Sequence, residues 1–143
     1  MKTAILLSAI LFITFSISAQ KVNSSDVPLE VRTTLAEMYP GAPNVTWEFV
    51  NGKYVAGFKE TGVETSVFFL PAGSYLQTET KILVTSLPAG VNSYASKNFP
   101  GNEISTAKRI IDADGTIRFK AKIGNSNYLF DADGVYISKA TDK

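Results

Sequence analysis

The chain has 143 residues, of which 14 are lysine or arginine and 13 are aspartate or glutamate, and it contains no histidine and no cysteine. Without these two residue types it lacks disulfide bridges, the usual zinc ligands and most nucleophile and base pairs of hydrolases. Its balanced charge argues against nucleic-acid binding, which needs a dense basic patch. We therefore expect no enzyme and no cofactor. A hydrolase working through carboxylates alone stays open as an alternative, without a recognisable motif.

Residues 1–19 have the pattern of a secretory signal peptide. Met1 and Lys2 lead into an apolar run over 4–17, and Ala19 is a small residue suited to cleavage. The run is interrupted by hydroxyl side chains and is shorter than the roughly 20 apolar residues that span a membrane. We expect cleavage before Gln20, a periplasmic or secreted protein, and no membrane span in the mature chain.

The remaining chain contains two copies of one pattern, which predicts two units over 20–80 and 81–143. A hydrophobic residue with proline recurs 60 positions later, and so does an aromatic residue followed by proline and glycine. The matched positions are Val27 and Leu87, Pro28 and Pro88, Tyr39 and Phe99, Pro40 and Pro100, and Gly41 and Gly101. The shared positions lie mainly where helices and turns begin or end.

Each unit opens with a predicted helix, over about 28–38 and about 88–98. In the first, Val31 and Leu35 belong to an apolar stripe at helical spacing, while Ser25 and Asp26 are candidate caps before Pro28. The residue before a proline avoids the helical conformation, and a following glycine permits a left-handed turn. The aromatic residue that ends each helix is therefore expected to fold its ring onto the core.

After each helix the apolar period changes to two, which predicts strands. In the first unit we expect strands near 45–49, 54–58, 65–69 and 75–77, with Asn51 and Gly52 forming a tight hairpin turn. In the second we expect strands near 104–112, 116–123, 127–131 and 135–139. The predicted fold is α+β, with two tandem units of one helix followed by a four-stranded antiparallel sheet. A lone unit of this size is marginal, so the two units should pack together or form one continuous sheet of about eight strands. Both helices should pack on one sheet face, leaving the other face free.

The sequence Asp-Ala-Asp-Gly occurs at 112–115 and at 131–134. Clustered aspartates before a glycine also occur in calcium loops, but an EF-hand loop needs further ligands and a late glutamate that neither copy has. A hairpin turn, with aspartate accepting backbone hydrogen bonds, explains both copies. A small-ligand or calcium-binding envelope protein using these turns remains the alternative function.

The strand alternation assigns side chains to two faces of the sheet. The aromatic residues Trp47, Phe49, Tyr54, Phe58 and Phe69 share the apolar side and are expected to form the core beneath the first helix. The predicted partner-binding residues on the opposite side are Phe68, Leu70, Arg118, Lys120 and Lys122, with Arg109 as a candidate neighbour. A plain solvated face, whose lysines resist association, is the alternative interpretation.

The sequence resembles the PepSY-like, or beta-lactamase-inhibitor-like, periplasmic proteins of Gram-negative bacteria. The resemblance rests on "YPGAPNVTWE", "YVAGF" and the turn at 73–75 in the first unit, and on "NFPG" and "LFDADGVY" in the second. It implies a tandem helix-plus-four-strand fold like that of the beta-lactamase inhibitory protein, in which the concave sheet face grips an enzyme, but it does not imply that this chain inhibits a lactamase. The turn "LPAG" departs from the aspartate-rich turn of the family, and Trp47 has no counterpart in the second unit. We expect an exported, inhibitor-like module that binds a protein or peptide through its open sheet face.

Overall fold

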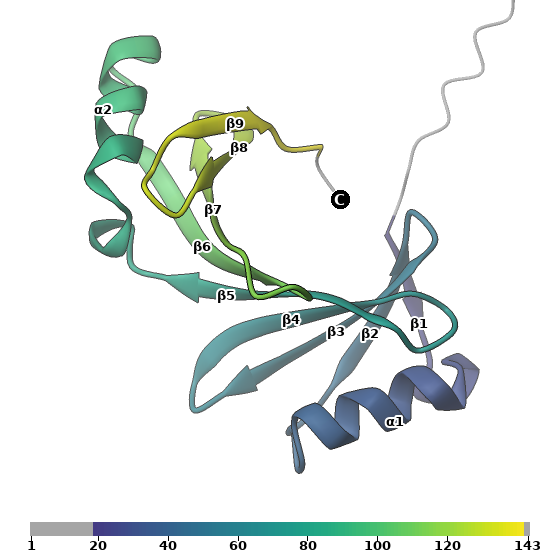
Figure 1. The fold of residues 1–143 in the computed structure, drawn as a ribbon. Helices are drawn as coiled ribbons and strands as arrows, with labels where there is room; N and C mark the ends of the chain where they lie inside the picture. Colours follow the sequence, from purple (N-terminus) through teal and green to yellow (C-terminus); the bar gives the residue numbers. More distant parts are fainter. Residues whose placement is uncertain (1–18, 142–143) are drawn as a thin grey trace, which may run out of the picture.

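The computed structural model describes residues 19–141, so the predicted signal peptide lies outside the described residues except for Ala19. Two α-helices, two short 3-10 helices and nine strands follow one another along this range (Figure 1). The helices are α1 (Leu29–Met38) and α2 (Ala89–Asn98), and the 3-10 helices are Ser24–Asp26 and Val84–Ser86. The strands are β1 (Gln20–Val22), β2 (Thr46–Val50), β3 (Lys53–Glu60), β4 (Val63–Phe69), β5 (Tyr75–Ile82), β6 (Ile104–Asp112), β7 (Ile117–Ile123), β8 (Ser126–Asp131) and β9 (Tyr136–Lys139).

All nine strands form a single antiparallel sheet in the order of the chain. β5 and β6 join the two halves of the chain through a continuous register that runs from Gln77 opposite Asp112 to Ile82 opposite Ala107. The sheet is therefore continuous, which is one of the two arrangements expected for the two units. β1, which pairs with β2, adds one strand to the expected eight.

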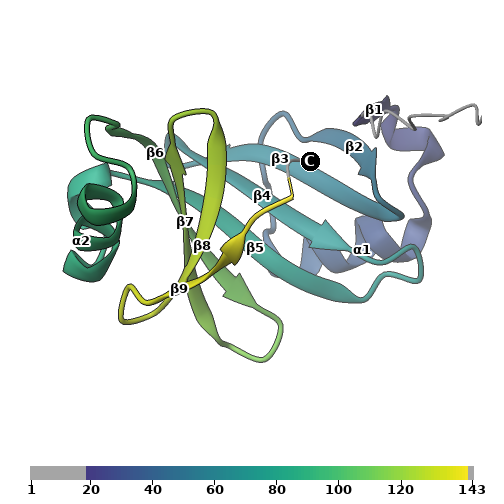
Figure 2. The ribbon, with the colours of Figure 1, turned by 90° about the horizontal axis from the view of Figure 1, so that it is seen from above.

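Both helices pack on the same face of this sheet, as predicted. α1 covers a core that contains Trp47 and Phe69, and α2 covers a core that contains Phe130. The sheet bends so that the helices lie on its outer, convex side (Figure 1). Viewed from above, α1 and α2 lie at opposite ends of the sheet (Figure 2). Among residues 19–141, no helix covers the inner, concave face.

The predicted N-terminal caps are wrong. Ser25 and Asp26 belong to a 3-10 helix, and the N-cap of α1 is Pro28, which makes no side-chain cap bond. The Pro28 carbonyl instead accepts the first intrahelical bond from the Arg32 amide, at 3.1 Å. Ser24–Asp26 forms a 3-10 helix of its own, which ends before the N-cap position of α1 at Pro28. Its side chains are therefore not at the position from which they could cap α1.

The aromatic residues that end the helices pack as predicted. The Tyr39 ring lies 5.1 Å from the Phe58 ring, and the Phe99 ring lies 5.0 Å from the Tyr128 ring. The glycines that follow, Gly41 and Gly101, have positive φ angles of 78° and 83°. Within residues 19–141, neither helix is long and apolar enough to cross a bilayer.

Candidate partner-binding groove

The concave face holds a groove of about 280 Å³, which we call the concave groove. Strands from both halves of the chain line it, together with the β2–β3 turn and the residues that follow β9. Its lining residues are Val50, Asn51, Lys53, Phe68, Gln77, Glu79, Ile110, Arg118, Lys120, Leu129, Ala140 and Thr141. The groove therefore combines an apolar wall with a concentrated set of charged side chains.

Glu79 of β5 lies at the centre of this charged set. Its side chain is only 1 % exposed, and it accepts hydrogen bonds from Lys120 Nζ at 2.6 Å and from Lys108 Nζ at 3.4 Å. The Gln77 amide donates a third bond to Oε1 at 3.0 Å. A buried carboxylate is tolerated only when it is paired and hydrogen-bonded, and Glu79 meets both conditions.

The two lysines decide the protonation state of Glu79. Burial alone raises the pKa of a carboxyl group, and it is the largest single influence on this one. The charges and hydrogen bonds of Lys120 and then Lys108 together outweigh burial, so the pKa of Glu79 lies below its ordinary value of 4.5. Glu79 is therefore an ionised group at neutral pH, held in the floor of the groove.

Arg118 forms a second ion pair beside Glu79. Its Nε and Nη2 atoms donate to the two carboxylate oxygens of Asp112 at 2.7 and 2.6 Å, a bidentate arrangement. The hydrogen bonds and charge of Asp112 raise the pKa of Arg118 against the opposing effect of burial. Arg118 also lies 3.4 Å from the Gln77 side-chain oxygen, which links the two ion pairs.

Three of the five predicted partner-binding residues come together in the groove. Phe68, Arg118 and Lys120 line it, whereas Leu70 lies in the turn after β4 and Lys122 lies farther along β7. Leu70 is 41 % exposed, and Lys122 pairs in register with Asn127. The structure thus gathers a smaller set than the sequence analysis named.

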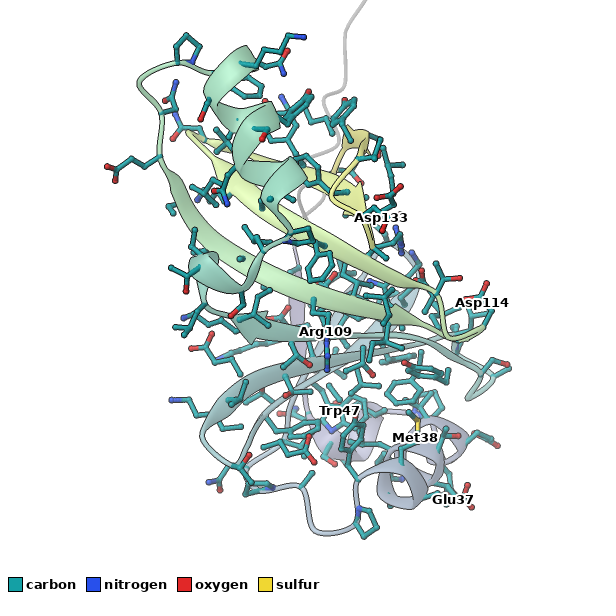
Figure 3. All side chains as sticks on the ribbon, turned by 60° about the vertical axis from the view of Figure 1, so that its left-hand side comes forward. Glu37, Met38, Trp47, Arg109, Asp114 and Asp133 are labelled. Carbon is teal, nitrogen blue, oxygen red and sulfur yellow. The ribbon has the colours of Figure 1, made fainter. Side chains whose placement is uncertain are left out.

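Arg109 does not join this face, which corrects the sequence expectation. In the β6–β7 register Arg109 stands opposite Phe119, on the side that bears the helices (Figure 3). The residue that stands opposite Lys120 is Lys108. The side of the sheet on which Arg109 lies depends on the register of β6 against β7, which the sequence does not specify.

Sequence reasoning also missed the acidic members of the site, Glu79 and Asp112. Glu79 lies in the segment Gln77 to Lys81, in which every residue is polar. The segment therefore shows no alternation of apolar and polar residues that would identify a strand. The partners of Glu79 become visible only when β5 pairs with β6. The alternation of Gln77, Glu79 and Lys81 was the one available signal, since it places all three on a single face.

The two Asp-Ala-Asp-Gly segments form hairpin turns, as predicted. Asp131 Oδ1 accepts the Asp133 and Val135 amides, both at 2.9 Å, and Asp114 Oδ1 accepts the Thr116 amide at 2.9 Å. This backbone hydrogen bond lowers the pKa of Asp114. Asp114 and Asp133 lie on two separate turns (Figure 3). Within residues 19–141 no three acidic side chains gather in a way that would hold a metal ion.

Comparison with solved structures identifies the fold. A protein from Bacteroides eggerthii that is described as periplasmic superimposes on this chain with a TM-score of 0.71 at 23 % identity, over 80 % of this chain and 88 % of that chain. A DUF2874 family protein from Bacteroides uniformis gives a TM-score of 0.70 at 23 % identity, over 79 % and 88 %. A BLIP-like protein from Bacteroides fragilis gives a TM-score of 0.62 at 20 % identity, over 78 % and 83 %.

No family model and no curated protein sequence matches the chain. The similarity is therefore one of fold and not of close sequence. The chain shares the two-helix, antiparallel-sheet architecture of DUF2874 and BLIP-like proteins.

Proposed function

We propose that this protein is an exported, non-enzymatic binding module, inhibitor-like in form, that holds a segment of a protein or peptide partner in the concave groove. The pattern of residues 1–19 and the assignment of a neighbour of similar fold to the periplasm support a periplasmic or secreted location. The BLIP-like name of another neighbour supports an inhibitor-like use of the fold.

The observation that supports the proposal is that the helices cover only one of the two faces of the sheet. Both helices lie on the convex face, so the concave face is the side on which strands of both halves are open to a partner. Phe68 is half-buried in this groove, with charged groups nearby. Interfaces commonly combine a buried aromatic anchor with a polar surround.

The decisive experiment is capture of a partner from an envelope extract on immobilised residues 20–143, followed by measurement of its affinity for variants. Phe68→Asp places a charge at the apolar wall and should weaken binding at least about tenfold, the effect of losing one anchor residue. Val63→Asp is the matched control, because Val63 lies on the same strand, is 39 % exposed and points to the opposite face. Equal affinity for the wild type and Phe68→Asp would contradict the proposal.

We also propose that the fold consists of two copies of one unit, each a helix followed by four strands. In the first half, a Cβ added to Gly73 would lie 2.9 Å from the Glu30 Cβ at the start of α1. In the second half, a Cβ added to Gly134 would lie 2.9 Å from the Pro88 Cβ at the start of α2. This equivalent contact, between a turn and the helix before it, supports two copies of one unit fused within one sheet.

A further inference from the structure

Two lysines share a single carboxylate at the concave groove, one of them, Lys120, in its lining and the other, Lys108, beside it. Lys108 and Lys120 stand directly opposite each other in the β6–β7 register, where like charges are unfavourable. Both contact Glu79, which is therefore one carboxylate between two ammonium groups. This three-residue cluster carries a net charge of +1.

The other charged groups of the groove do not remove this excess. Arg118 and Asp112 neutralise each other, and Lys53 adds a further positive charge at the exposed rim. Among the residues that line the groove, Lys53, Arg118 and Lys120 are positive and Glu79 is negative, which leaves a net charge of +2. Lys108 and Asp112, which contact lining residues from outside, cancel each other. The apolar wall beside them strengthens any charge interaction formed there, because it keeps water away.

Charge complementarity therefore selects the kind of segment that fits. We propose that the concave groove binds partner segments in which an acidic side chain is flanked by apolar residues, an inference that rests on the proposed function. The carboxylate pairs with the excess charge of Lys120, Lys108 and Lys53, and the flanking side chains contact Phe68 and Leu129. A basic segment is repelled, and a neutral one leaves the excess charge without a counterion.

Selection of a random peptide library displayed on phage, against residues 20–143, tests the charge preference directly. Selected peptides should be enriched in aspartate or glutamate next to apolar residues. For the best peptide, made synthetically, changing its acidic residue to the amide should weaken binding about tenfold. Lys53→Gln in the protein should weaken binding about threefold, and high salt should reduce both differences.

Lys59→Gln is the matched control, because Lys59 lies on the same strand as Lys53 but outside the groove lining, and it should leave affinity unchanged. Peptides that lose binding in Phe68→Asp but show no acidic enrichment overturn this inference and leave groove binding intact. Peptides that bind equally to the wild type and Phe68→Asp, or the absence of any selected peptide, overturn recognition of peptide segments by the groove altogether.

Discussion

Glu79 is the residue on which the concave face most depends. Its carboxylate has almost no contact with water and is held by Lys108, Lys120 and Gln77. Replacing it with glutamine keeps the shape but leaves two lysines opposite each other without an anion. Because removal of one partner from a buried pair is strongly unfavourable, Glu79→Gln should lower the free energy of unfolding by about 3 kcal/mol. Urea denaturation measures this change.

An exposed ion pair provides the control for that prediction. Glu64 and Lys81 lie 3.4 Å apart, with side chains that are 59 % and 52 % exposed. Solvent screens this pair, so Glu64→Gln should change the free energy of unfolding by less than about 1 kcal/mol. Equal effects of the two substitutions would show that burial of Glu79 has no special weight.

The lowered pKa of Glu79 also predicts a pH dependence. A carboxyl group with a folded pKa below its unfolded value stabilises the protein above the unfolded pKa, here near 4.5. That contribution is lost as the pH falls from 4.5 through the lower folded pKa. The difference in unfolding free energy between the wild type and Glu79→Gln should therefore be constant above pH 5 or so and shrink below it. A difference independent of pH would contradict the ion-pair account.

At the scale of elements, each helix is fixed by the turn between the third and the fourth strand after it. Gly134 has a φ of +83°, and an added Cβ would also lie 3.1 Å from the Gly90 Cα. Gly115 has a similar φ of +86° in the equivalent sequence motif, but a Cβ there meets nothing within 4 Å. The two glycines therefore separate backbone strain from steric contact.

We predict that Gly134→Ala lowers the free energy of unfolding by about 3 kcal/mol, because it adds a clash with the start of α2 to the strain of a positive φ. Gly115→Ala should lower it by only about 1 kcal/mol, the strain alone. Thermal denaturation followed by far-UV circular dichroism measures both. If the two variants have the same stability, the contact between this turn and α2 contributes nothing.

The elements themselves could largely be predicted from the sequence. The helical stripes and the strand alternation located α1, α2 and β6 closely, since apolar periodicity reflects burial on one face. β1 could not be predicted, because three residues are too few to establish an alternation. The caps of α1 were wrong because a local 3-10 helix competes for the same polar residues.

At the scale of the whole molecule, the concave groove could be predicted only in part. Strand alternation identified Phe68, Arg118 and Lys120 as members of one face, and the structure brings them together. Glu79 was missed and Arg109 was misplaced, because both assignments depend on how β5, β6 and β7 align. Register is a property of the assembled sheet, and it is set by contacts that are distant in the sequence.

The continuous sheet predicts that the two halves unfold together. β5 and β6 pair across the junction, and the contacts of Glu79 with Lys120 and of Gln77 with Arg118 cross it as well. Opening one half alone would break this ladder and leave the Glu79 carboxylate without its lysines. One cooperative transition is therefore expected, even though the apolar cores under α1 and α2 are separate.

Tryptophan fluorescence tests this coupling, because Trp47 is the only tryptophan of the chain and reports on the core under α1. A Trp47→Phe, Phe99→Trp variant moves the reporter to the core under α2, where Phe99 packs on Tyr128. In that variant, fluorescence and far-UV circular dichroism should give the same urea midpoint, and the same coincidence should hold in the wild type. Separate midpoints in either protein would mean that β5 and β6 join two independently stable halves, and that the groove between them opens without global unfolding.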